Sequence, residues 1–261
     1  MLETLEMIEI SQPSPILNRR CINVAATPNA LAISEDFEFA ALSVADNYRK
    51  ALLCEFSEYL RGNALEVGAG IGQITEALLA NENIKRCVSI EPHSTFYAKL
   101  REKFPGHDLV NGTIEDLKGD AGWDCVVSIN VLEHIKNDER ELKSYHDHLR
   151  RNGGVLCLFV PARMEIYAQL DRDFGHFRRY VKPELREKLE GAGFDVLRLR
   201  YYNLAGYFAW WLNFCVFQKR GFNAGSVRFF DRFIFPWVHG FESRICPPIV
   251  GQSLLAVARA K

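Results

Sequence analysis

The sequence Glu66-Val67-Gly68-Ala69-Gly70-Ile71-Gly72 follows a short apolar run, Ala64–Val67, and carries three glycines at alternate positions. Glycines allow a sharp turn after a strand and let the backbone approach a ligand closely. A helix that starts near Gly72 would present unpaired N–H groups to that ligand. The carboxylate of Glu66 would repel a pyrophosphate and therefore favours a cationic ligand. Taken alone, the loop is also compatible with an ordinary tight turn between a strand and a helix.

Outward from this loop, segments with the apolar pattern of strands alternate with segments of helical spacing. Such alternation predicts an α/β fold with a parallel sheet and helices on both faces. Ligands in this kind of sheet bind at the carboxyl ends of the strands. We expect strands at 64–67, 86–91, 108–111, 123–129, 155–160, 194–201 and 253–258, and helices within 37–60 and at 72–79, 94–104, 138–150 and 183–191.

The composition is that of an ordinary globular protein: 48% of the 261 residues are hydrophobic, 25% are charged, and the net charge is −1. This balance argues against binding nucleic acid by broad phosphate neutralisation, so we expect no nucleic-acid partner. The seven cysteines show no CxxC spacing, and we expect no metal site. Reduced thiols suit a cytoplasmic protein, and residues 1–18 lack the pattern of a signal peptide.

Acidic residues follow two later strand ends, at places where a nucleotide would lie. Glu91 ends the second expected strand, where an acidic side chain in a Rossmann-like site accepts hydrogen bonds from ribose hydroxyls. In Gly112–Leu117, Ile114 could pack on an adenine face, and Glu115 or Asp116 could accept from its amino group. The alternative for each of these acids is a solvated charge at the surface.

Five segments in this order, ALEVGAGIGQIT, VSIEP, GTIEDL, SINVLEHI and LRRNGGVLCLFVPA, resemble the class I methyltransferases that depend on S-adenosylmethionine (SAM). The resemblance covers roughly residues 45–202 and the final strand. It implies a Rossmann-like fold with a seven-stranded, mostly parallel sheet, in which the last strand, 253–258, is antiparallel. It also implies an enzyme that binds SAM as its cofactor.

The resemblance assigns parts of SAM to particular residues. It implies that Glu66 and the backbone of Gly68–Gly72 hold the methionine part and that Glu91 holds the ribose. Ile114 with Glu115 would hold the adenine. The complete expected cofactor set is Tyr48, Glu66, Gly68, Ala69, Gly70, Gly72, Glu91, Pro92, Thr113, Ile114, Glu115, Asn130, Val131 and His134.

The segment Asn130-Val131-Leu132-Glu133-His134 lies at the mouth of the fourth expected strand, where the transferred methyl group should face. Asn130 sits where the family places a main-chain contact to SAM. His134 could orient SAM, line the acceptor pocket or act as a base. Because this histidine recurs in the family across many acceptors, a cofactor or structural role is favoured.

The segment 171–180 concentrates two acids, three arginines, a histidine and a tyrosine after the fifth expected strand. It resembles a subgroup of bacterial methyltransferases with a GHxRRY segment and no defined acceptor. His176 could remove a proton from an acceptor hydroxyl or amine, and Arg178 or Arg179 could clamp a carboxylate or phosphate. Tyr180 joins them as a candidate for catalysis and acceptor binding. The alternative is a loop held by Asp–Arg pairs.

Residues 204–250 stand where the plain fold needs only a short turn, and they are rich in aromatic residues with interleaved basic ones. We expect a helical insertion here, with Tyr207 and Trp211 as acceptor contacts. It could form a lid over the acceptor, a dimer interface, or a membrane contact. The remaining organisation is an N-terminal arm or lid, 1–36, and a SAM-binding domain made of 37–203 and 251–261.

The function that these features favour is transfer of a methyl group from SAM to the oxygen or nitrogen of a small acceptor. The acceptor could carry a carboxylate, or it could be apolar or linked to a lipid. A SAM-binding module without turnover, or a membrane-surface module, is the first alternative. An NAD-dependent oxidoreductase is disfavoured, because the loop reads ExGxGxG rather than GxGxxG.

Overall fold

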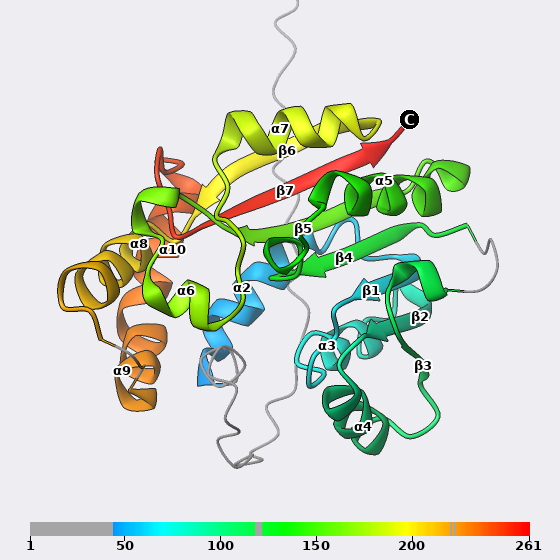
Figure 1. Ribbon diagram of the computed structural model, residues 1–261, viewed down its shortest axis with the longest axis horizontal. Helices are drawn as coiled ribbons and strands as arrows, with labels where there is room; N and C mark the ends of the chain where they lie inside the picture. Colours follow the sequence, from blue (N-terminus) through cyan, green and yellow to red (C-terminus); the bar gives the residue numbers. More distant parts are fainter. Residues whose placement is uncertain (1–43, 118–121, 220, 222) are drawn as a thin grey trace, which may run out of the picture.

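A seven-stranded sheet runs through the computed structural model, which describes residues 44–117, 122–219, 221 and 223–261 (Figure 1). The strand order is β3-β2-β1-β4-β5-β7-β6, and β7 is antiparallel to both of its neighbours, as predicted. The expected arm, 1–36, lies outside the described residues. The strands are β1 (Gly62–Val67), β2 (Ile84–Glu91), β3 (Asp108–Asn111), β4 (Cys125–Ile129), β5 (Val155–Pro161), β6 (Phe194–Tyr202) and β7 (Ser253–Ala260).

Helices cover both faces of the sheet because the central strands are apolar on both sides. Along β1, Ala64 packs in the core cluster of one face, and Leu65 packs in the cluster of the other. The first cluster also contains the buried thiols of Cys87, Cys125 and Cys157. The covering helices are α2 (Asp46–Phe56) and α3 (Thr75–Leu79) on the first face, and α5 (Asp138–Leu149) and α7 (Lys182–Gly191) on the second.

The helix after the glycine loop begins later than the sequence pattern predicts. It starts at Thr75 rather than at Gly72, and turns connect it to the loop. Gly72 has a φ of +82°, a left-handed conformation that cannot continue an α-helix, and a Cβ there would lie 2.4 Å from the ring of Phe104. The close packing of α4 (Ser94–Lys103) and Phe104 against this turn therefore requires glycine.

The segment between β6 and β7 is helical in its described part, as predicted, and gathers at the end of the sheet where β4 and β5 end (Figure 1). Its elements are α8 (Leu204–Trp210), the π-helical η5 (Trp211–Val216), α9 (Ala224–Phe229), the π-helical η6 (Phe230–Ile234) and α10 (Phe235–Arg244). No helix in the described ranges has the length and apolarity that a membrane crossing requires.

Two buried carboxylates tie this insertion to the end of β6 and to α2. Glu242 on α10 accepts hydrogen bonds from the backbone N–H groups of Asn203, at 3.0 Å, and Leu204, at 2.6 Å. Asp231 on η6 accepts from the backbone N–H groups of Asn47, at 3.0 Å, and Tyr48, at 2.8 Å. Both acids of the insertion therefore accept hydrogen bonds from backbone N–H groups inside the protein, and neither is exposed to solvent.

Candidate functional site

The carboxylate of Glu91 lies at the end of β2 and is held by the glycine loop. One oxygen accepts from the backbone N–H of Gly70 at 2.7 Å, and the other accepts from the backbone N–H of His93 at 2.8 Å. Burial raises the pKa of this carboxyl, although the two N–H donors oppose the rise. Each carboxylate oxygen can accept a second hydrogen bond, so the group is suited to a pair of hydroxyls such as those of a ribose.

The glycine loop itself lies against the mouth of β4. The backbone N–H groups of Gly68 and Ala69 both donate to the carbonyl of Ile90, at 2.9 and 3.0 Å. Gly68 has a φ of +74°, and a Cβ there would lie 2.3 Å from a methyl group of Val131. Asn130, one residue earlier, adopts a left-handed φ of 53°. The loop and the end of β4 thus lie together, as their positions at the ends of neighbouring strands predict.

Glu66 is buried beneath the loop, where its carboxyl accepts from the hydroxyls of Thr75, at 2.7 Å, and Ser89, at 2.6 Å. Burial raises the pKa of Glu66 to about 7, although these two hydroxyls oppose the rise. The group is therefore only partly ionised near neutral pH. Its expected attraction for a cationic ligand remains a prediction, and the visible role of the side chain is to tie the start of α3 to β2.

The raised pKa of Glu66 predicts a specific dependence of stability on pH. The folded state holds the proton more tightly than the unfolded chain does, so this group stabilises the fold below pH 4.5 and loses that contribution as the pH rises to about 7. Between pH 5 and pH 8, the free energy of unfolding of Glu66→Gln should rise by roughly 2–3 kcal/mol relative to that of the wild type. Urea unfolding at both pH values measures this change. Glu82→Gln, at an exposed position, is the control, and an equal gain in both variants would contradict the assignment.

The residues expected around adenine lie beyond the end of β3. Ile114 is buried in the core of the sheet, whereas Glu115 is exposed and pairs with Arg140 at 2.7 Å. Asp116 accepts from the backbone N–H of Thr113 at 2.8 Å and so caps its own turn, η1 (Ile114–Asp116). Pro92, in the same expected set, is exposed. Because an exposed ion pair such as Glu115–Arg140 contributes little free energy, Glu115 could exchange Arg140 for a ligand at small cost. The adenine contacts remain predictions.

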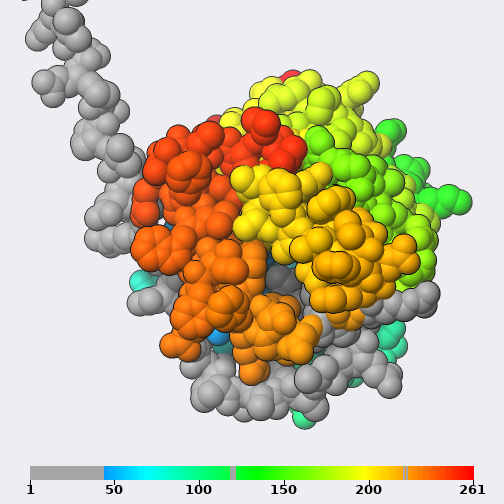
Figure 2. Space-filling view, turned by 90° about the vertical axis from the view of Figure 1, so that its left-hand side faces the viewer, coloured from blue at the N-terminus to red at the C-terminus, as the bar shows by residue number. Residues whose placement is uncertain are grey.

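A cavity of about 710 Å³ lies between the ends of β4 and β5 and the insertion. Figure 2 shows the hollow between the two parts of the insertion, α8–η5 and α9–α10. Asn130 and Tyr48 line it, which places the end of β4 between the glycine loop and the cavity. The aromatic and aliphatic lining includes Phe159, Phe174, Trp210, Phe214, Phe229, Phe230 and Ile234, and the polar lining includes His176, Arg179, Asn203, Asn213 and Gln252.

His176 and Arg179 share a buried carboxylate at the inner wall of this cavity. One oxygen of Asp171, on α6 (Gln169–Asp173), accepts from Nδ1 of His176, at 3.1 Å, and from Nε of Arg179, at 2.7 Å. Burial alone would raise the pKa of Asp171, but these two partners outweigh it and lower the pKa. The Arg179 guanidinium also stacks over the ring of Trp210 at 4.5 Å. An ionised Asp171 therefore holds the histidine with its Nδ1 proton toward the carboxylate.

Other residues expected at the acceptor site are not among those that line the cavity. Arg178 pairs with Asp138 at 2.7 Å, and the Tyr180 hydroxyl donates to the same carboxylate at 3.0 Å, fully buried. The Tyr207 hydroxyl lies 3.3 Å from Glu165. Trp211 is exposed. Arg178 and Tyr180 therefore hold the segment 171–180 against Asp138, as the alternative of a loop held by Asp–Arg pairs predicts.

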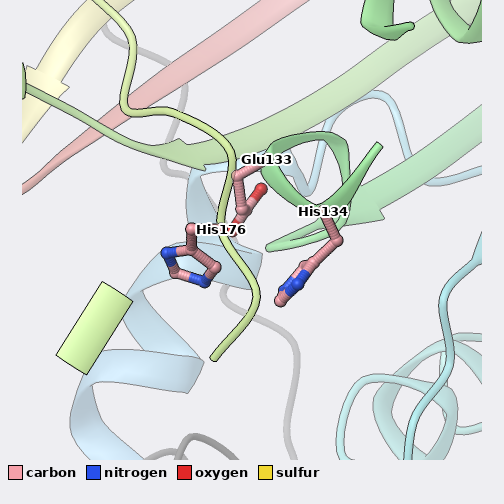
Figure 3. A group of neighbouring side chains, drawn as sticks. All are labelled: Glu133, His134 and His176. Carbon is pink, nitrogen blue, oxygen red and sulfur yellow. The ribbon is translucent and has the colours of Figure 1, made fainter. Parts of the chain in front are cut away.

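Glu133, His134 and His176 point toward one another at the end of β4 (Figure 3). Glu133 and His134 come from η2 (Leu132–His134), and one ligand atom from each of the three residues lies within 4.8 Å of the others. The imidazole of His134 stands edge-on to that of His176, with ring centroids 4.6 Å apart. A carboxylate and two imidazoles are ligands that divalent metals accept. The cysteine spacing predicts no metal site, whereas these three side chains are of the ligand type and close enough together to hold a divalent ion.

The cavity also contains residues that sequence reasoning did not assign to the site. Trp210 and Phe214 face inward, and the Trp210 indole donates to the carbonyl of Ile166 at 3.0 Å. Asn203 caps α8 and bonds Gln252 at 2.9 Å. The sequence did contain one indication of Asn203, since a polar residue between a strand and a helix is typical of a helix cap. Tyr207, Phe208 and Trp211 are also aromatic, so no pattern identified Trp210 as the residue on the inward face.

The methyltransferase domain family matches residues 38–199, more than half of the chain. The chain therefore belongs to this family, and it is a class I SAM-dependent methyltransferase. This membership decides between SAM and NAD in favour of SAM. Similar curated proteins include a ubiquinone biosynthesis O-methyltransferase from Rickettsia canadensis, 22% identical over 64% of this chain and 79% of the relative. A trans-aconitate 2-methyltransferase from Rhodopseudomonas palustris is 23% identical over 51% of this chain and 55% of its own length.

Solved structures share the fold. A complex of DhpI with SAH has a TM-score of 0.55 and 16% identity, over 85% of this chain and 90% of the other. A SAM-dependent methyltransferase from Clostridium acetobutylicum has a TM-score of 0.52 and 11% identity, over 82% and 91% of the two chains. At the carboxyl edge of the sheet, the Glu91 carboxylate can accept further hydrogen bonds beside a glycine loop with positive φ angles. This arrangement fits SAM.

Proposed function

We propose that this enzyme methylates a small, largely apolar acceptor that carries an ionisable group, held in the cavity beneath 204–250. The observation that carries the proposal is the lining of that cavity, which combines aromatic walls with His176, Arg179 and Asn130. Apolar walls with a few convergent polar groups are typical of small-molecule sites. The O-methyltransferase name of one relative supports an oxygen acceptor.

We assign the cofactor to the edge formed by the glycine loop, Glu91 and Asn130. Glu91 would accept from the ribose hydroxyls, and the loop backbone would hold the methionine part. When bound, SAM supplies a methyl group on a sulfonium, which is already activated for displacement. The protein therefore has mainly to align the acceptor and to exclude water.

Within the cavity, we assign His176 the role of general base. Asp171 holds Nδ1, so Nε2 is the nitrogen that would take the proton from an acceptor hydroxyl or amine. Arg179 adds positive charge to the same wall and so favours an acidic group on the acceptor. In this assignment Tyr48 completes the wall beside Asn130, and Tyr180 and Arg178 hold the segment in place.

The test is incubation of the purified protein with SAM labelled on its methyl group and a metabolite extract of the source organism. We expect label to move into a low-molecular-weight, moderately apolar product. Label in protein or nucleic acid would contradict the proposed acceptor class. SAM binding without any transfer, over a range of extracts, would favour the SAM-binding module without turnover.

A further inference from the structure

Large apolar side chains cover the outside of the insertion. We call this group the insertion surface. Trp237, on α10, is 81% exposed, and patches of this kind on a protein commonly mark contact sites. The members of the insertion surface are Phe208, Trp211, Leu212, Val216, Phe217, Phe229, Phe233, Trp237, Phe241, Ile245 and Ile249.

The exposed charges on the insertion are all positive in its described part. Lys219, Arg228, Arg232 and Arg244 are exposed. The acids, Asp231 and Glu242, are 5% and 2% exposed and accept backbone N–H groups. Arg232 lies over the ring of Phe233, and Lys219 lies over the ring of Phe217. The insertion surface therefore combines apolar rings with cations at close range.

The insertion surface is continuous with the cavity. Phe229 and Ile234 line the cavity, yet they are 58% and 37% exposed. They therefore stand at its mouth, next to Phe233. The hollow in Figure 2 opens on this same face, between the two parts of the insertion.

We propose that the insertion surface docks on an anionic lipid bilayer, with the cavity mouth facing the lipid. Aromatic side chains with interleaved cations suit the headgroup region of such a membrane. A symmetric dimer through the same surface would place its cations against each other, which disfavours a second copy as the occupant. Access of an amphiphilic acceptor from the bilayer rests on the proposed function, whereas docking itself does not.

Co-sedimentation with phosphatidylcholine vesicles, with and without phosphatidylglycerol, tests the docking. We expect sedimentation with the anionic vesicles, and much less with the neutral ones or at high salt. The double variant Arg228→Glu/Arg232→Glu should weaken partitioning roughly tenfold or more, since each basic residue near such a surface contributes about 1 kcal/mol. The matched control is Lys85→Glu/Lys99→Glu, which changes two exposed cations elsewhere.

Fluorescence gives a second, position-specific readout. Brominated anionic lipids should quench part of the tryptophan emission, and the double variant Trp211→Phe/Trp237→Phe should remove most of that quenching. Leu197→Ser, at an exposed apolar position on β6, should change neither measurement.

No sedimentation with anionic vesicles, equal partitioning of both charge-reversal variants, or a dimer that Trp237→Phe dissociates would overturn the proposal. SAM binding, measured in parallel, reports on the cofactor site. A protein that binds SAM but not vesicles therefore refutes the docking alone.

Discussion

Replacing His176 by asparagine should lower kcat by roughly 10²–10⁴-fold if this imidazole takes a proton from the acceptor, because that is the usual contribution of a general base. The asparagine amide can occupy the place of Nδ1 and keep the hydrogen bond to Asp171, so the wall of the cavity should survive. Only the Nε2 position is lost. The measurement is steady-state transfer from labelled SAM to the acceptor identified in the extract, over a range of pH.

His176→Asn should keep the fold and the cofactor site of the wild type, because the hydrogen bond to Asp171 is retained. SAM affinity should change little. His148→Ala is the matched control, since its imidazole bonds the carbonyl of Ser144 on α5 and does not line the cavity. An unchanged kcat would indicate an acceptor that needs no base, such as a carboxylate. Activity lost to a chelator and restored by a divalent metal would assign His176 to metal binding with Glu133 and His134 instead.

Much of the fold could be predicted because the strands are short apolar runs that end at polar residues. The strand Asp108–Asn111 has the bounds that were predicted, and most other strand ends differ by only one or two residues. The error at the start of α3 arose from the loop glycines, since a left-handed Gly72 delays the helix in a way that residue spacing does not reveal. The short helix Gln169–Asp173 carried no clear period and was not expected.

The site was less predictable because neighbouring residues of one segment face opposite ways. Arg178 and Tyr180, two positions apart, both reach Asp138, while Arg179 between them reaches Asp171 on the cavity side. The motif identifies the cluster but not which arginine faces the acceptor. In the same way, Trp210 is buried and Trp211 is exposed, since the insertion is apolar on both its inner and outer faces. Because both faces are apolar, the sequence did not indicate which aromatic residues face the cavity, and those on the outer face form the insertion surface.

Replacing Glu91 by alanine should weaken SAM binding by roughly 10²–10⁴-fold, because two hydrogen bonds to a charged group would be lost, each contributing about 1.5–3 kcal/mol. Titration calorimetry with SAM measures the loss. The variant also leaves the Gly70 and His93 N–H groups without their acceptor, and a loop distorted by that loss would weaken binding as well. Glu115→Ala removes an exposed carboxylate and leaves the glycine loop untouched, and it tests the adenine assignment separately.

A SAM analogue without ribose hydroxyls separates the ribose contact from distortion of the loop. The wild type should prefer SAM over this analogue strongly, and Glu91→Ala should lose most of that preference, since the partner of the hydroxyls is gone. If Glu91 acted only by shaping the loop, both ligands would weaken together and the preference would persist. Unchanged affinity for SAM itself would remove Glu91 from the cofactor site, and the fit of the β2 end to SAM would then depend on the glycine loop and Asn130 alone.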